Sequence, residues 1–149
     1  MDAETLVGMW LRHRQVTQQL ARVMPAEHFG FKAWEGGQSY GDLLVHIVNA
    51  AGRQLDTAEG KEPGSTSQGE LPATPEAIRA WVDEQTARQT ERLRTVADDP
   101  NRTVSSRGAP LPLQVFLAQM REHEAHHKGQ LMMMARMCGV RDELFYVAR

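Results

Sequence analysis

Apolar residues recur every three or four positions along most of this chain, which is the period of an amphipathic α-helix. The first such segment runs from Ala3 to Met24, where Pro25 interrupts the pattern. We predict a first helix over this range. Its inward face comprises Leu6, Met9, Trp10, His13, Val16, Thr17, Leu20, Val23 and Met24.

The second helical segment begins after Ser39, which suits the N-cap position and has Asp42 three residues further on. It ends near Gly60. The following stretch, Lys61 to Pro72, is polar and interrupted by proline, glycine and serine, so we predict a long, mobile crossover loop. The apolar positions of this helix are Leu43, Leu44, Ile47, Val48, Ala51 and Leu55.

Two further helices are predicted in the second half of the chain. Thr74 and Pro75 provide an N-cap and a first helical residue, and the cluster Asp98 to Asn101 ends that third helix. The fourth runs from about Leu113 to Cys138, followed by Gly139 as a left-handed C-cap. We treat Arg102 to Pro110 between them as a loop, with a short extended piece as the alternative.

Four long helices predict an all-α fold, a four-helix bundle, formed by residues 1–149 as a single domain. A net charge of -2 gives no electrostatic reason to expect nucleic acid or an anionic membrane as partner. The N-terminus lacks the pattern of a signal peptide, and no segment has the roughly 20 apolar residues that span a bilayer. We therefore expect a cytoplasmic protein, and a single cysteine agrees with a reducing compartment.

The fourth predicted helix contains three of the six histidines within five residues, His123, His126 and His127. Histidines four apart lie one turn apart on one helix face, where both can reach one metal ion. At about 100° per residue from Phe116, His123 falls near -20° and His127 near +20°, both in the expected core stripe, whereas His126 falls near -80° at its edge. The spacing therefore favours His123 and His127 as a pair of metal ligands.

A metal ion needs at least one further ligand from elsewhere in the chain. His46 in the second helix and His13 in the first are the candidates, with His28 in a loop as a more distant choice. His13 has the better helical phase, whereas His46 lies at the flank of its apolar stripe. The residues alone do not decide between these histidines.

A competing interpretation comes from the run His123-Glu124-Ala125-His126-His127, which also fits the His-Glu-x-x-His pattern of zinc peptidases. In that pattern the glutamate acts as general base. The extended context is absent here, since Gly129 comes one residue early and no histidine follows His127. We do not favour a peptidase, although Glu124 is kept as a candidate base for a smaller hydrolase, with an exposed helix residue as the alternative.

Two stretches resemble the motifs of the DinB/YfiT-like family. These are the residues around His46, from Asp42 to Ala50, and the run His123 to Leu131, which ends in Gly129-Gln130-Leu131. The order of Trp10, Met24-Pro25, Thr74-Pro75 and Trp81 is similar as well. The resemblance implies a four-helix bundle, commonly a homodimer, with a divalent metal ion bound by His46, His123 and His127.

The resemblance also implies a class of reaction, because family members include enzymes that use low-molecular-weight thiols such as bacillithiol or mycothiol. We expect an ion, most readily Zn²⁺ or Ni²⁺, that activates such a thiol for transfer to an electrophilic small-molecule substrate. Hydrolysis by a metal-bound water is one alternative, and a non-catalytic, stress-associated metal-binding protein is another. Asp42 and Gln130 are candidates for hydrogen bonds to the ligand histidines.

Overall fold

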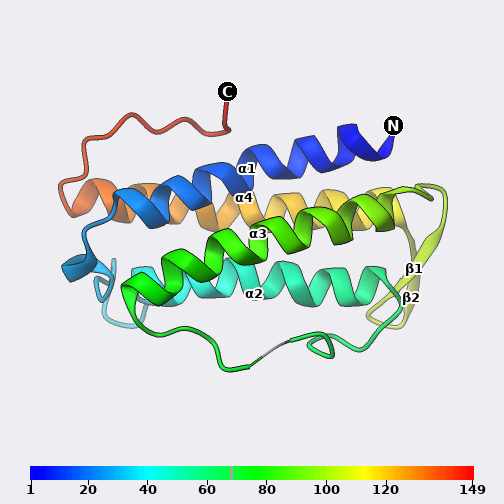
Figure 1. Cartoon of the computed structure of the whole chain (residues 1–149), viewed down its shortest axis with the longest axis horizontal. Helices are drawn as coiled ribbons and strands as arrows, with labels where there is room; N and C mark the ends of the chain where they lie inside the picture. Colours follow the sequence, from blue (N-terminus) through cyan, green and yellow to red (C-terminus); the bar gives the residue numbers. More distant parts are fainter. Residues whose placement is uncertain (68) are drawn as a thin grey trace.

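Four long helices make up most of the structure, a computed structural model that describes residues 1–67 and 69–149 (Figure 1). They form an all-α bundle, as predicted, and their ends lie within a few residues of the expected ones. The helices are α1 (Ala3–Val23), α2 (Tyr40–Ala58), α3 (Pro75–Ala97) and α4 (Leu113–Met137). A short 3₁₀ helix, η1 (Ala26–His28), follows α1.

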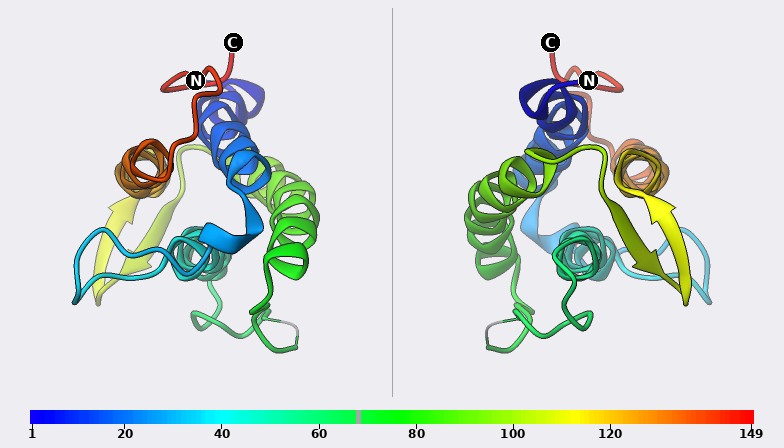
Figure 2. Two further views of the ribbon diagram at one scale, coloured as in Figure 1. Left: turned by 90° about the vertical axis from the view of Figure 1, so that its left-hand side faces the viewer. Right: turned by 90° about the vertical axis from the view of Figure 1, so that its right-hand side faces the viewer.

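Seen from its end, the bundle has one helix at each corner (Figure 2). α1 and α2 lie diagonally opposite, and each packs against both α3 and α4. α2 and α3 run in the same direction, and the described parts of their connection return along the bundle beside them (Figure 1). The expected crossover between the second and third helices is therefore present, and it leaves α2 and α4 as antiparallel neighbours.

The helix ends follow the local rules read from the sequence. The Ser39 hydroxyl accepts a hydrogen bond from the Asp42 amide at 3.1 Å, and the Thr74 hydroxyl accepts one from the Ala77 amide at 3.3 Å. Gly139 adopts a φ of 86° just beyond α4, a conformation that suits glycine. Local capping therefore fixes where α2, α3 and α4 begin or end.

One expected loop is in fact a β-hairpin. β1 (Thr103–Ser106) pairs antiparallel with β2 (Ala109–Pro112) through the turn Arg107-Gly108, so the prediction of a loop over this range was wrong. Each strand has only four residues, Val104 alone among them is buried, and two prolines lie in β2. In such a short, exposed and proline-containing segment, the alternation of apolar and polar residues is too weak to predict a strand.

The core consists of two apolar clusters, one in each half of the bundle. Tyr40, Leu44 and Leu131 belong to one cluster, and Trp10 and Leu55 belong to the other. Buried polar side chains of α1, α3 and α4 link the helices as well: Arg14, Thr17, Thr86, Gln89 and Glu124. None of the helices in the described residues has the length and apolar character needed to cross a membrane.

Candidate metal centre

Three histidines from two helices converge on the α2–α4 side of the bundle. His46 lies on α2, and His123 and His127 lie one turn apart on α4. One ring nitrogen of each lies within 4.8 Å of those of the other two. The ring centroids are 4.6 to 5.1 Å apart, so the three side chains form one compact group.

Hydrogen bonds orient this group. The Nε2 atoms of His46 and His127 lie 3.2 Å apart, so both face the same point. The other nitrogen of His127, Nδ1, lies 2.7 Å from Oε1 of Gln130, which can only accept a hydrogen bond. With its proton on Nδ1, His127 keeps a lone pair on Nε2, which is the arrangement that a metal ligand requires.

The surroundings keep His46 and His123 neutral. Burial lowers the pKa of His123 to about 4, with further contributions from the neighbouring His127 and His46. Burial also lowers the pKa of His46, and His127 adds to the effect. Neutral imidazoles have a free lone pair, so His46 and His123 need lose no proton to bind a cation near pH 7.

The spacing of the nitrogens suits a divalent ion. Two nitrogens bound to one tetrahedral Zn²⁺ at 2.0–2.1 Å are about 3.3 Å apart, close to the 3.2 Å between the Nε2 atoms of His46 and His127. An all-imidazole donor set also suits Zn²⁺ and Ni²⁺. His46, His123 and His127 therefore fit a bound divalent cation.

From helical phase we correctly predicted that the two α4 histidines face the bundle, but we overestimated how deeply they are buried. His123 and His127 are partly buried, and the centre of the buried face lies instead along Met120, Glu124 and Leu131. The phase argument left charged residues out of the core stripe and so centred it wrongly. The pair lies at the flank of the buried face, where a ligand from outside can reach it.

Glu124 has a role that sequence analysis did not anticipate. Its side chain is almost fully buried, and its two carboxylate oxygens accept hydrogen bonds from Arg14 at 2.7 and 2.9 Å. The Thr17 hydroxyl donates a further hydrogen bond at 3.0 Å. This carboxylate is neither an exposed helix residue nor available as a general base, and the peptidase interpretation loses the residue on which it depends.

The Arg14–Glu124 pair belongs to a network that reaches all four helices. Arg14 also donates to Oε1 of Gln89 at 2.7 Å, and the Gln89 amide nitrogen donates to the Val48 carbonyl at 2.9 Å. These bonds connect α1 and α4 to α3 and α2. Because Glu124 is next to His123 on α4, the network fixes the rotation of α4 that presents His123 to His46. Arg14, four residues after Trp10, shares the inward phase of α1 and could have been found from that spacing.

The other candidate residues lie outside the group. His13, which helical phase preferred, contacts the buried Lys128 through Nδ1 at 2.8 Å and does not join the three histidines. His126 is exposed and packs its ring against that of His127. His28 lies in η1. Asp42 is exposed, and no residue that the structure describes hydrogen-bonds to its carboxylate, whereas Gln130 makes the expected contact.

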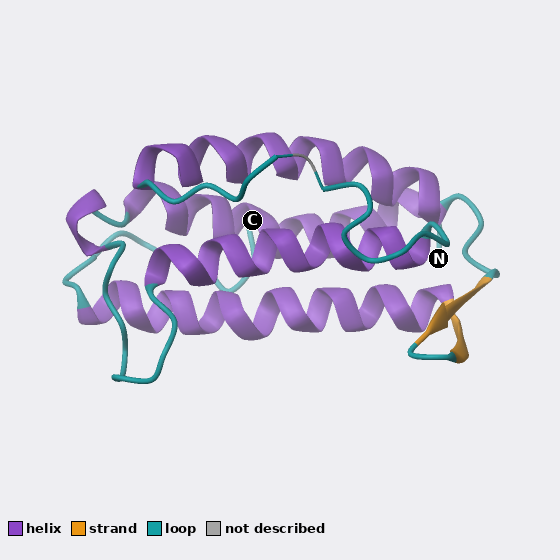
Figure 3. Cartoon of the chain, turned by 90° about the horizontal axis from the view of Figure 1, so that it is seen from below, coloured by secondary structure: helices purple, strands orange, loops and turns teal. Residues whose placement is uncertain are grey.

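Two cavities of different character flank the histidines. His123 lines one of about 830 Å³ against the β-hairpin, together with polar side chains such as Gln54 and Gln119. His127 lines another of about 450 Å³, whose wall includes Trp34 and Met133. The hairpin and the loop that carries Trp34 project from the same side of the bundle at opposite ends (Figure 3). The histidine group is therefore reachable from both directions.

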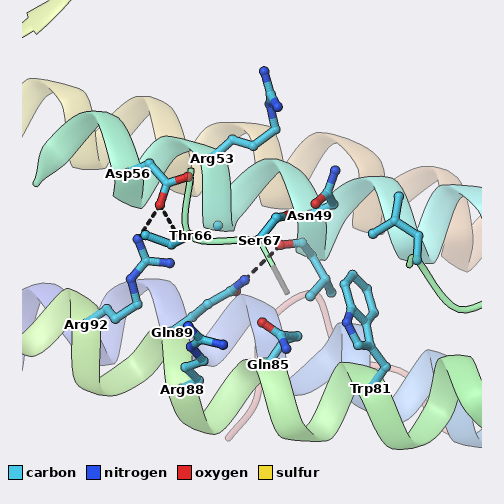
Figure 4. A pocket seen from close by; sticks show the side chains of 13 residues that line it. Asn49, Arg53, Asp56, Thr66, Ser67, Trp81, Gln85, Arg88, Gln89 and Arg92 are labelled. Carbon is cyan, nitrogen blue, oxygen red and sulfur yellow. Dashed lines mark hydrogen bonds and ion pairs between the residues drawn. The ribbon is translucent and has the colours of Figure 1, made fainter. Parts of the chain in front are cut away.

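A further pocket lies between α2 and α3, where the crossover packs (Figure 4). Asp56 of α2 accepts hydrogen bonds from Arg92 of α3 and from the Gly64 amide of the crossover, each at 2.7 Å, and also from the Thr66 hydroxyl. The remaining space is about 30 Å³, far below the roughly 150 Å³ of a cavity that binds benzene. This pocket fastens the crossover and has no room for a substrate.

A family model described as the DinB family matches residues 1–149. The chain belongs to the DinB family. The resemblance seen in the histidine motifs is thus confirmed over the whole sequence. Among DinB relatives, the uncharacterised protein YjoA of Bacillus subtilis (strain 168) is 28% identical over 151 residues, which cover 99% of this chain and 98% of YjoA.

Solved structures of DinB-like proteins share the fold. The crystal structure of YjoA matches with a TM-score of 0.83 at 26% sequence identity, covering 97% of this chain and 99% of that one. A DinB-like protein from Bacillus cereus ATCC 10987 matches with a TM-score of 0.80 at 23% identity, covering 95% and 97% of the two chains. The DinB bundle therefore extends over nearly the full length of this chain.

Proposed function

We propose that this DinB protein is a metal-dependent enzyme that activates a low-molecular-weight thiol, which loses its S–H proton and bonds through its sulfur to the electrophilic atom of a small molecule. The observation that carries the proposal is the convergence of His46, His123 and His127, with ligand nitrogens within 4.8 Å of one another, on an accessible side of the bundle. Three protein ligands leave coordination positions open, as catalytic metal sites do.

A bound Zn²⁺ or Ni²⁺ ion would supply a Lewis acid that lowers the pKa of a thiol at this site and so favours the nucleophilic thiolate at neutral pH. Residues of the chain hold the ligand histidines in the protonation state that metal binding requires. His46 and His123 are held neutral by burial, and Gln130 keeps the proton of His127 on Nδ1.

The cavities on either side of the histidines support a reaction of two small molecules. One cavity adjoins His123 and the other adjoins His127, so two reactants can approach the same centre from opposite sides. The proposal includes a cytoplasmic location, where small thiols are plentiful, and assembly as a homodimer. Hydrolysis is less well supported, because Arg14 and Thr17 occupy the Glu124 carboxylate that was the candidate base.

Thiol conjugation measured on metal-loaded protein tests the proposal. We expect disappearance of the free thiol in the presence of an electrophile, and no acceleration with the variant His46→Ala, which lacks one ligand. His126→Ala is the matched control, because this exposed neighbour lies outside the group and its loss should leave the rate within about twofold. Equal rates for wild type and His46→Ala would contradict the proposal.

A further inference from the structure

The cavity beside His123 has a charge that distinguishes it from the rest of the chain. It lies between α2, α4 and the β-hairpin, and Arg53 and Arg107 are among its lining residues. Among the described residues, no aspartate or glutamate lines it. In a chain with a net charge of -2, this is a local excess of positive charge.

Neither arginine forms an ion pair with a carboxylate of the residues that the structure describes. Figure 4 shows the Arg53 side chain pointing away from the Asp56 carboxylate and from Arg92, although Arg53 and Asp56 are one turn apart on α2 and line the same α2–α3 pocket. Without an ion pair, the Arg53 guanidinium is able to bind an anion.

Neutral polar side chains line the cavity beside the arginines. Gln54 and Gln119 each bring an amide, a group that can donate and accept hydrogen bonds.

The backbone at Arg107 is a second observation. This residue has a φ of 51° and precedes Gly108 with a φ of 79°, so both central residues of the hairpin turn are left-handed. Turns of this kind favour asparagine, aspartate or glycine at the first position, and arginine is strained there. The strain is understandable if the guanidinium is required at the hairpin tip.

We propose that this cavity binds the carboxylate-bearing end of the small molecule whose other end reaches the histidine group. Arg53 and Arg107 pair with its carboxylates, and the amides of Gln54 and Gln119 are available for hydrogen bonds to its other polar groups. The lining residues Phe116 and His123 are separated by about 10 Å along α4, so the ligand is of tripeptide size. This inference rests on the proposed function, since it names the class of molecule that would be presented to the same centre.

Calorimetric titration with S-methylglutathione tests the inference separately from metal chemistry. This tripeptide derivative has two carboxylates and no free thiol, so it cannot supply a thiolate to a metal ion. We expect it to bind at low-millimolar concentration, with a dissociation constant that rises with salt, and its diethyl ester to bind at least about tenfold more weakly. We expect Arg53→Gln and Arg107→Asn each to weaken binding about three- to tenfold.

The variants have matched controls. Arg107→Asn places a residue that tolerates a positive φ in the turn, so the hairpin is retained while the charge is lost. Arg22→Gln removes an exposed arginine from α1, outside the cavity, and should leave affinity unchanged. Binding should also persist within about twofold in metal-free protein, because the contacts belong to the arginines.

The outcomes separate the two proposals. If S-methylglutathione fails to bind, or binds equally well to wild type, Arg53→Gln and Arg107→Asn, the inference is overturned even where metal-dependent thiol transfer is observed. If the arginine variants weaken binding while no metal or thiol chemistry is found, the cavity assignment stands and the proposed reaction fails.

Discussion

At the scale of single residues, His123 and Glu124 are neighbours in sequence but differ in burial. His123 lies at the accessible flank of α4, whereas Glu124 is buried against Arg14. Removing one member of a buried ion pair leaves the other charge without compensation, which is costly. The pair therefore makes a measurable contribution to the stability of the bundle.

We expect Arg14→Met to lower the free energy of unfolding by about 3 kcal/mol, because Glu124 is left buried without its cation. Urea unfolding followed by circular dichroism measures this. Arg22→Met, which removes an arginine 3.7 Å from Asp83 at the surface, should change stability by less than about 0.5 kcal/mol. If Arg14→Met lowers the free energy of unfolding no more than the control variant does, the Arg14–Glu124 pair does not stabilise the fold.

The pKa of His13 provides a prediction about pH. Burial, with a further contribution from Lys128, lowers it from 6.5 to about 4. Between these values the unfolded chain binds a proton that the folded chain does not, so folding stability falls as the pH drops from 6.5 towards 4. His123 contributes in the same direction.

We therefore expect His13→Gln to reduce this acid destabilisation by about 1–2 kcal/mol, after allowance for the contact of His13 with solvent. Glutamine keeps an acceptor for Lys128 and does not titrate. Urea unfolding of metal-free protein at pH 7 and pH 4.5 measures the difference. An unchanged pH dependence in the variant would contradict the prediction.

The candidate site could be predicted only in part from the sequence. The spacing of His123 and His127 placed them together, yet periodicity could not choose between His46 and His13, because both lie near the apolar faces of their helices. The choice depends on which helices are neighbours, and that is a property of the whole bundle. The burial of Glu124 and Lys128 was missed because charged residues enter a core only when partners from distant segments compensate them.

At the scale of elements, the crossover between α2 and α3 is fixed by one carboxylate. Burial alone would raise the pKa of Asp56, but hydrogen bonds from Thr66, Arg92 and Gly64 outweigh it and lower the pKa. The charged form is thus the one that holds the crossover. Gly64 and Thr66 of the crossover are thus hydrogen-bonded to the bundle. The mobility expected from the polar, glycine-rich sequence of this segment stays a prediction.

We expect Asp56→Asn to release this segment while leaving the four helices formed. Asparagine has only one acceptor oxygen, so some of the hydrogen bonds from Gly64, Thr66 and Arg92 are lost, at a cost of about 1–3 kcal/mol. Hydrogen exchange at the Gly64 amide should become faster. The exposed Asp42→Asn is the control, and equal exchange in the two variants would contradict this role of Asp56.

Elements with strong local signals were predictable from sequence. Helix periodicity and the caps Ser39 and Thr74 located α2 and α3 closely. The hairpin was not predictable, since its strands are short and its turn has Arg107 where the preferred residues are absent. Its pairing is stabilised by packing of Val104 against the end of the bundle, which local sequence does not reveal.

At the scale of the whole molecule, the order of helices brings the three histidines of the candidate site together. The crossover makes α2 and α4 antiparallel neighbours, so His46 meets a histidine pair that lies about 80 positions later in the sequence. The polar network that includes Arg14 and Glu124 holds this arrangement. The central claim is that the resulting group binds a divalent metal ion.

The most direct test is the metal content of the purified protein, measured by elemental analysis after dialysis against Zn²⁺ or Ni²⁺ and removal of excess ion. We predict about one ion per chain in wild type and in His13→Ala, and a loss of most of it in His46→Ala and in the double variant His123→Ala/His127→Ala. Metal retained by the double variant, or lost from His13→Ala and kept by His46→Ala, would contradict the assignment.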